Sequence, residues 1–200
     1  MAITATNDLV SEKLRKIFND PATILYSTEV YDMDSGADGK ELTLAFEYRL
    51  PVTVDTLQIS QDDPTVNHYK IIGLGGDWTT SATLGDVSIQ LTIPNVSKEA
   101  LTMCFGADNV KDVTNVKIGT DSYEGHGLIM KKHKMSGTIG ILASNDKDLM
   151  VVSGAAMFAK LLYDNPGTDP FAIQLNGGIE IDEEKPAVTW LTKKTAQLTR

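Results

Sequence analysis

The strict alternation of apolar and polar residues in two segments constrains this chain more than any other feature of its sequence. In residues 84–94 the apolar side chains occupy every second position, namely Val87, Ile89, Leu91 and Ile93. The polar positions of the same segment are Asp86, Ser88, Gln90 and Thr92. Residues 42–50 repeat the pattern, with Leu42, Leu44, Phe46, Tyr48 and Leu50 as the apolar set. Successive side chains of a strand point to opposite faces, so each segment is predicted to be a strand with one buried face.

Other segments are also predicted to be extended. They are residues 52–60, 66–73, 127–143, 171–182 and 187–192. The apolar phase slips between Val54 and Leu57, which indicates a bulge or a bend there. Residues 149–163 are ambiguous, because Met, Ala and Leu favour a helix whereas Val151, Val152 and Phe158 favour a strand. About eight strands separated by turns are typical of a β-sandwich or a barrel.

Two segments have helical spacing. In residues 7–19 the apolar residues Val10, Leu14, Ile17 and Phe18 fall at helical spacing, and Asn7 or Asp8 can cap the start. Residues 97–105 form a second, short helix, with Ser97 as its N-cap and Gly106 at its end. We therefore expect a mainly β fold, a β-sandwich or half-barrel, with one short flanking α-helix. Residues 1–30 would form an N-terminal helix or arm, and residues 31–200 a single β domain.

The charge balance bears on possible partners. The 200 residues carry a formal net charge of −9, which argues against a protein that grips nucleic acid, because that affinity comes from clustered Lys and Arg. No apolar run approaches the length of a membrane-spanning helix, and the N-terminus lacks the pattern of a signal peptide. The single cysteine, Cys104, cannot form an internal disulfide and is expected to be a small core residue.

The motifs that resemble chemical sites are incomplete. The loop over residues 32–40 contains Asp32, Asp34, Ser35, Gly36, Asp38 and Gly39. A calcium loop starting at Asp34 would need a closing acid at position 45, which is Ala45, so a solvated or projecting loop is the preferred interpretation. The glycines of residues 73–76 precede no helical pattern, so they do not predict a phosphate site.

Nothing in the spacing of nucleophiles, acids or histidines selects a catalytic set. Ser144 and Lys147 match a Ser-x-x-Lys spacing, but a polar turn fits the residues around them better. His68, His126 and His133 do not pair at helical spacing, and Cys104 has no partner cysteine, so zinc is not expected. We expect no enzyme activity, no cofactor and no metal site.

Two runs of charge have two interpretations. The basic run contains Lys131, Lys132, His133 and Lys134, and the acidic run contains Glu180, Asp182, Glu183 and Glu184. Such runs are commonly solvated surface. Alternatively, they are complementary patches between subunits, where opposite charges fix the register of two partners.

The order of elements in residues 42–192 resembles that of phage tail tube proteins. The likeness is carried by the acidic turn Gln61, Asp62, Asp63 and Pro64, by the Gly85–Asp86 pair that opens an alternating strand, and by the short helix that ends at Phe105 and Gly106. It continues in a polar turn over residues 164–170 and in the strand that starts at Phe171. The N-terminal helix is not part of the resemblance.

The resemblance implies a structural subunit of a virion. Six copies would form a ring with a continuous β-barrel wall, and rings would stack into a tube that double-stranded DNA passes through without specific binding. The partners would be other copies and other tail proteins, with no membrane. The protein would reside in the virion tail, and in the host cytoplasm during assembly.

Particular residues are candidates for these contacts. The loop over residues 32–40 is a candidate for contact between rings, and Asp86, Ser88, Gln90 and Thr92 are candidates for a lumen or an outer face. A neutral or acidic wall suits a conduit, because a basic wall would hold the DNA. The alternatives are another virion protein, such as a tail terminator or capsid decoration protein, or a ligand-binding β-sandwich module; an enzyme ranks last.

Overall fold

The chain is mainly β. A computed structural model describes residues 20–34, 41–53, 55–70, 72, 75, 77–164, 167–182 and 184–194. These residues form twelve strands, the α-helix α2 (Lys98–Phe105) and the 3-10 helix η1 (Ala107–Asn109). The strands are β1 (Pro21–Ser27), β2 (Tyr48–Leu50), β3 (Gln58–Gln61), β4 (Thr65–Lys70), β5 (Asp77–Thr83), β6 (Val87–Ile93), β7 (Val110–Ile118), β8 (Asp121–Leu128), β9 (Lys134–Ala143), β10 (Asp148–Leu162), β11 (Ala172–Ile179) and β12 (Val188–Thr192).

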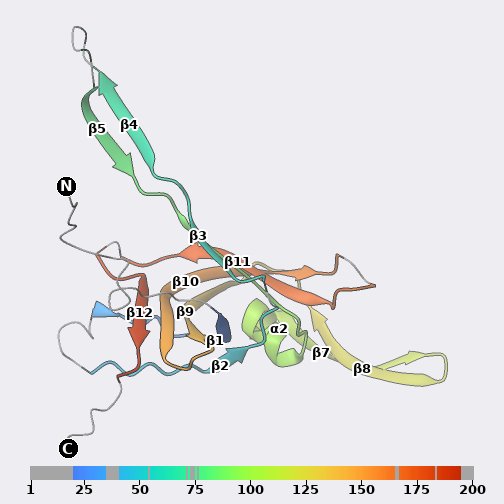
Figure 1. The fold of residues 1–200 in the computed structure, drawn as a ribbon. Coiled ribbons are helices and arrows are strands. Elements are labelled where there is room, and N and C mark those ends of the chain that lie inside the picture. The colour runs from blue at the N-terminus through green and yellow to red at the C-terminus, as the bar shows by residue number, and fades with distance from the viewer. Residues whose placement is uncertain are drawn as a thin grey trace, which may run out of the picture.

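Eight of these strands form one antiparallel sheet that curls into a half-barrel (Figure 1). Its order is β2-β1-β9-β10-β11-β6-β3, and β12 pairs with β10 beside this path. The remaining strands form two separate hairpins, β4–β5 and β7–β8. Of the two architectures predicted from the sequence, the half-barrel is therefore the observed one.

Strand β10 is the centre of the sheet. It runs for 15 residues and pairs with β9 along both of its halves. Its first half also pairs with β12, from Asp148 to Val152, and its second half pairs with β11, from Ala155 to Leu162. The register shifts between Val152 and Ala155, where Gly154 has a φ of +70°. A bulge bends a strand, so at this position the partner of β10 on the side opposite β9 changes from β12 to β11.

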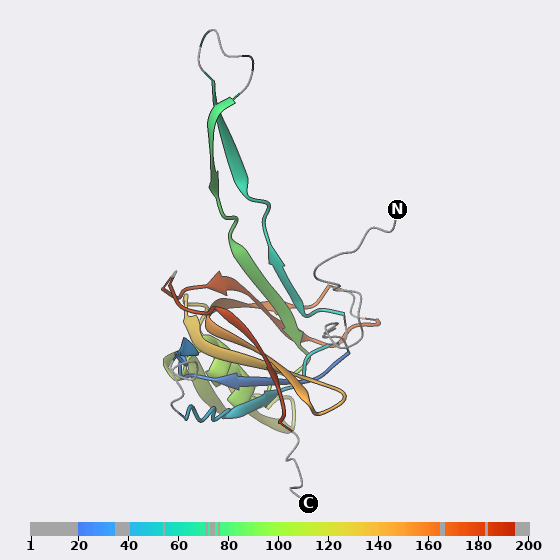
Figure 2. The same ribbon diagram turned by 60° about the vertical axis from the view of Figure 1, so that its left-hand side comes forward.

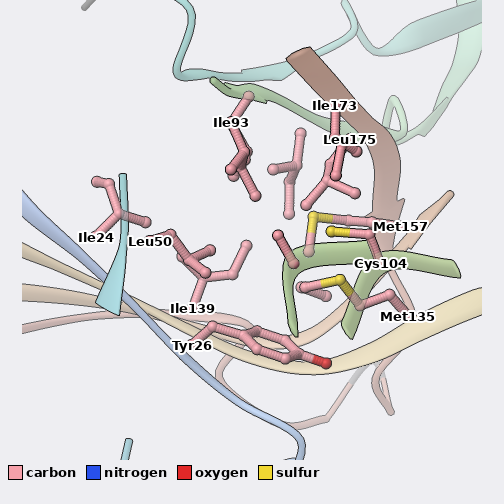
Figure 3. Packing of buried hydrophobic residues seen from close by; sticks show 14 of the residues in the cluster. Ile24, Tyr26, Leu50, Ile93, Cys104, Met135, Ile139, Met157, Ile173 and Leu175 are labelled. Carbon is pink, nitrogen blue, oxygen red and sulfur yellow. The ribbon is translucent and has the colours of Figure 1, made fainter. Parts of the chain in front are cut away.

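The main core lies between the sheet and α2 (Figure 3). Apolar side chains of β6, β9, β10 and β11 face Leu101, Cys104 and Phe105 of the helix. The hydroxyl of Ser97 accepts a hydrogen bond from the Ala100 amide and caps the helix, which ends at Gly106 with a φ of +86°. The predicted short helix and its caps are confirmed. We call the sheet surface that packs on α2 the core face, and the opposite surface the outer face.

A second, smaller core covers part of the outer face. Tyr31 and Met33 pack with Val151 of β10, and the partly buried Leu42, Leu44, Leu149 and Leu191 pack around them. The Tyr31 hydroxyl donates to the Ala45 carbonyl at 2.7 Å, which ties the two covering segments together. The ring of Phe46 lies so close to Gly140 that a Cβ there would be 2.7 Å from it. The rest of the outer face is left open.

Several sequence predictions need correction. Residues 42–50 alternate in burial as far as Phe46, but only Tyr48–Leu50 pairs as a strand, because the earlier residues lie over the outer face as a cover. The stretch 127–143 is not one extended segment, since it divides between the end of β8 and β9. The ambiguous residues 149–163 belong to a strand, β10, because both its faces pack against neighbours.

Other predictions are confirmed or lie outside the described residues. Strand β6 follows the predicted alternation, and the slip after Val54 corresponds to a turn in which the Thr56 amide donates to the Thr53 carbonyl. The weak strand at residues 66–73 and the strands at 171–182 and 187–192 appear as β4, β11 and β12. The predicted N-terminal helix, residues 7–19, lies outside the described part of the chain. Within the described residues, no helix is long and apolar enough to cross a membrane.

Candidate assembly surfaces

Two hairpins extend away from the body of the protein. Figure 1 shows β4–β5 and β7–β8 leaving opposite sides of the half-barrel, and Figure 2 shows how far the first stands clear of the sheet. Every residue of β4 is exposed, as are all residues of β7 after Val110. An isolated two-stranded hairpin is at best marginally stable in water, so both hairpins are candidates for contact with a partner.

The β7–β8 hairpin has one apolar face. The pairing sets Val113 opposite Gly125, Val116 opposite Tyr123 and Ile118 opposite Asp121. The register shifts between Val113 and Val116, and Asn115 has a φ of +61°, so the extra residue keeps both valines on the same face. Ile118 is 64% exposed and Tyr123 49% exposed. The apolar side chains of this face therefore lie in solvent.

The opposite face of the β7–β8 hairpin is polar and ties the hairpin to α2. The Lys98 ammonium lies 2.7 Å from the nearer carboxylate oxygen of Asp112, and His126 Nδ1 lies 3.2 Å from the same oxygen. The hydrogen bond from Lys98 lowers the pKa of the Asp112 carboxyl below its usual value. These contacts fix the base of the hairpin and leave its apolar face free to meet another surface.

The β4–β5 hairpin is rich in hydroxyl groups and poor in charge. Thr65 pairs with Thr83, and Tyr69 pairs with Thr79. The one charged contact that the structure places here is between His68 Nδ1 and the Asp77 carboxylate, at 2.7 Å. Exposed Val66 and Leu84 lie near the base of the hairpin. Strand β5 begins at Asp77, directly after the glycines of residues 73–76, so the sequence inference that no helix follows them is confirmed.

The exposed Lys134 of β9 and Lys160 of β10 lie on the outer face, but its open part over β3, β6 and β11 is uncharged and polar. We call it the amide–hydroxyl face, and its side chains are Gln58, Ser60, Ser88, Gln90, Gln174 and Asn176. The strand register aligns Gln58, Gln90 and Asn176 in one row across three strands. The Ser60 and Ser88 hydroxyls are 2.8 Å apart. This face therefore presents neutral hydrogen-bonding groups.

The predicted lumen residues are divided by the structure. Ser88 and Gln90 belong to the amide–hydroxyl face, whereas Asp86 lies at the base of the β4–β5 hairpin, where its carbonyl accepts from the Asp62 amide. Thr92 is only 6% exposed. The prediction that it lies on an open polar face is wrong, because the turn at residues 53–56 covers it and the Thr56 hydroxyl accepts a hydrogen bond from its amide.

The predicted inter-ring loop is anchored at its start. The Lys185 ammonium donates to the Asp32 carboxylate at 2.7 Å, and this hydrogen bond lowers the pKa of Asp32. The Asp32 carboxylate also accepts from the amide of Asp34. Ser35, Gly36, Asp38 and Gly39 lie outside the described residues, so the contact between rings stays a prediction.

The two charge runs meet within one chain. The Lys134 ammonium lies 2.6 Å from the Glu180 carboxylate, and both side chains are largely exposed. Lys132 lies over the ring of Phe158, 4.9 Å from its centroid. The carboxylate of Asp182 accepts from the Glu184 amide, and Glu183 lies outside the described residues. An exposed ion pair contributes little to stability, and a role of Lys131 and its neighbours between subunits stays a prediction.

The residues singled out as possible chemical sites lie apart in the described part of the chain. No group of three or more His, Cys, Asp or Glu side chains in this part of the chain is arranged to hold a metal ion. Cys104 is fully buried in the main core, and burial raises the pKa of its thiol to about 12. Ser144 and Lys147 lie in a polar turn, where the Asn145 side chain accepts from two backbone amides.

Neither hairpin was expected from the sequence to project from the sheet. β5, β7 and β8 were not predicted, and neither was β1, which directly follows the expected N-terminal helix. The pairing of β7 with β8 could have been found from Gly119 and Thr120, a two-residue turn between alternating segments. The bulge at residues 114 and 115 interrupts that alternation and hides it.

Comparison with family models, with curated proteins and with solved structures gave no match to this chain.

Proposed function

We propose that this chain is a structural subunit, not an enzyme, that assembles with copies of itself into a hollow tube of the phage tail-tube kind. The observation that carries the proposal is the pair of hairpins that extend from opposite sides of a half-barrel (Figure 1). Such hairpins need a partner to become stable, and two on opposite sides suit contacts that repeat from copy to copy.

The edges of the half-barrel support the same proposal. β2 and β3 end the main path of the sheet, and both are short, with 3 and 4 residues. Exposed edge strands are templates for pairing, and closure into a barrel removes them. In the proposed ring, the β3 edge of one copy meets the β2 edge of the next, and six copies close a continuous inner wall.

The amide–hydroxyl face suits the wall of a conduit for double-stranded DNA. Its side chains on β3, β6 and β11 carry no charge, and the whole chain has a net charge of −9. Cationic side chains would attract the phosphates and slow the passage of DNA. In the proposed tube this face lines the channel, with Lys160 and the Glu180-paired Lys134 at its border, and the helix side lies outside.

Electron microscopy of the concentrated protein tests the proposal. We expect tubes or stacked hollow rings in negative stain. A tail terminator would give single rings, a ligand-binding module would give isolated particles, and either result would contradict the tube. Sedimentation of a single monomeric species at every concentration would also contradict self-assembly.

A variant with a shortened β4–β5 hairpin tests whether this hairpin is an assembly contact. Replacing residues 65–83 with a short Gly-Ser turn removes an element whose β4 residues are all exposed, so the core stays intact. We expect an unchanged thermal unfolding transition and a loss of stacking. Normal tubes from the shortened protein would exclude the β4–β5 hairpin as an assembly contact.

A further inference from the structure

A groove of about 470 Å³ lies beside the start of β1. Its apolar lining is formed by Pro21, Ala22, Ile24, Leu50, Val52 and Leu57. Ile24 and Leu50 are buried and form its floor, whereas Val52 and Leu57 are half-buried and remain accessible. Asp20, Thr53 and Asp55 complete the lining, so the groove combines an apolar floor with a polar rim and favours an amphipathic occupant.

The rim of the groove is acidic. Asp20 and Asp55 both line it, and both side chains are exposed. They have positive φ angles, 56° and 65°, which are uncommon for residues other than glycine. The Asp20 carbonyl accepts a hydrogen bond from the Ser144 amide at 3.0 Å, which holds this turn against the end of β9. The chain therefore enters the described fold at the edge of the groove.

We propose that residues 7–19 of the same chain occupy this groove through their apolar face. The segment ends directly at Asp20, so no linker separates it from the groove and its effective concentration there is high. Its sequence predicts a helix with Val10, Leu14, Ile17 and Phe18 on one face. This apolar face matches the floor of the groove.

Charge complementarity supports the same occupant. The segment carries Lys13, Arg15 and Lys16, and the groove presents Asp20 and Asp55 at its rim. Opposite charges at the border of an apolar contact fix its orientation. The apolar face and the cationic side chains of the segment thus match the apolar floor and the acidic rim of the groove. Docking within one subunit does not depend on tube assembly.

Disulfide trapping tests the occupant directly. The double variant Ile17→Cys/Val52→Cys is oxidised and run on a non-reducing gel; the native Cys104 is buried and does not compete. We expect a cross-link within one chain, seen as a monomer without free engineered thiols by mass spectrometry. A dimer-sized product would overturn the proposal in favour of the segment of a second copy. Cross-linking no greater than in a control pair, Ile17→Cys/Ser122→Cys, would exclude docking.

Hydrogen exchange with a matched pair of variants gives a second readout. Leu14→Ala/Ile17→Ala truncates the apolar face, and Glu12→Ala/Asn19→Ala truncates the opposite face and keeps Lys13, Arg15 and Lys16 in place. We expect the amides of residues 52–57 to exchange about five- to thirty-fold faster in the first variant and at an unchanged rate in the second. Equal exchange in both variants would overturn the proposal.

Discussion

Replacement of Gly154 by alanine tests the bulge that organises the sheet. Gly154 has a φ of +70°, and an added Cβ would lie 2.6 Å from the Glu180 carbonyl oxygen. The same segment is fixed in place, because the Glu180 amide donates to the Gly154 carbonyl at 2.7 Å. The new methyl group would therefore meet backbone that cannot move without breaking this hydrogen bond.

The expected cost has two parts and one offset. A left-handed conformation costs a residue with a Cβ about 1–2 kcal/mol. Insertion of a methyl group into a packed site costs about 1–3 kcal/mol. Replacing glycine also lowers the conformational entropy of the unfolded chain, which stabilises the folded protein by about 0.4–1 kcal/mol. We expect Gly154→Ala to lower the free energy of unfolding by about 2–4 kcal/mol.

Urea denaturation measures this change, and two other glycines separate its causes. Gly119 has a φ of +64° with no atom near an added Cβ, so Gly119→Ala isolates the backbone cost and should lose about 1 kcal/mol. Gly125 has open space and no positive φ, so Gly125→Ala should change stability by less than about 0.5 kcal/mol. A Gly154→Ala protein as stable as the Gly125→Ala protein would refute the reasoning.

Two buried groups and one surface charge run give the remaining tests. The Cys104 thiol, with a pKa of about 12, should resist a maleimide in the folded protein and react in urea; labelling of the native state would contradict its burial. Burial and the nearby Glu47 raise the pKa of Tyr26 to about 12, above the usual 10. The folded state keeps this proton longer than the unfolded state, so stability should fall as pH rises from 10 to 12, and a flat profile in denaturant titrations would exclude the shift. If the basic run joins subunits, K131E/K132E should weaken assembly at low salt, measured by light scattering; unchanged assembly at all salt concentrations would remove that role.

The elements predicted correctly from the sequence are those whose local pattern and tertiary environment agree. β6 alternates because one of its faces meets the core, and the short helix has a capping serine and a terminal glycine. The buried cysteine and the polar turn at residues 144–147 follow from local chemistry in the same way. At the candidate site, Ser88 and Gln90 were identified, because strand periodicity alone assigns them to one face.

Other features depended on contacts between distant parts of the chain. Thr92 continues the periodicity of Ser88 and Gln90 but is buried, because a turn from residues 53–56 lies over it. Lys134 and Glu180 are 46 positions apart, and only the pairing of β9 with β10 and of β10 with β11 brings them together. No local pattern encodes such pairings.

The sequence by itself therefore determined the β character of the chain, the short capped helix and the net negative charge. Periodicity, capping residues and charge act over a few neighbouring residues or over composition as a whole. Tertiary structure alone decided which face stays open, which strands leave the sheet as hairpins and where β10 changes its neighbour. These outcomes depend on which distant segments cover a given strand, because burial belongs to the assembled sheet and not to the strand itself.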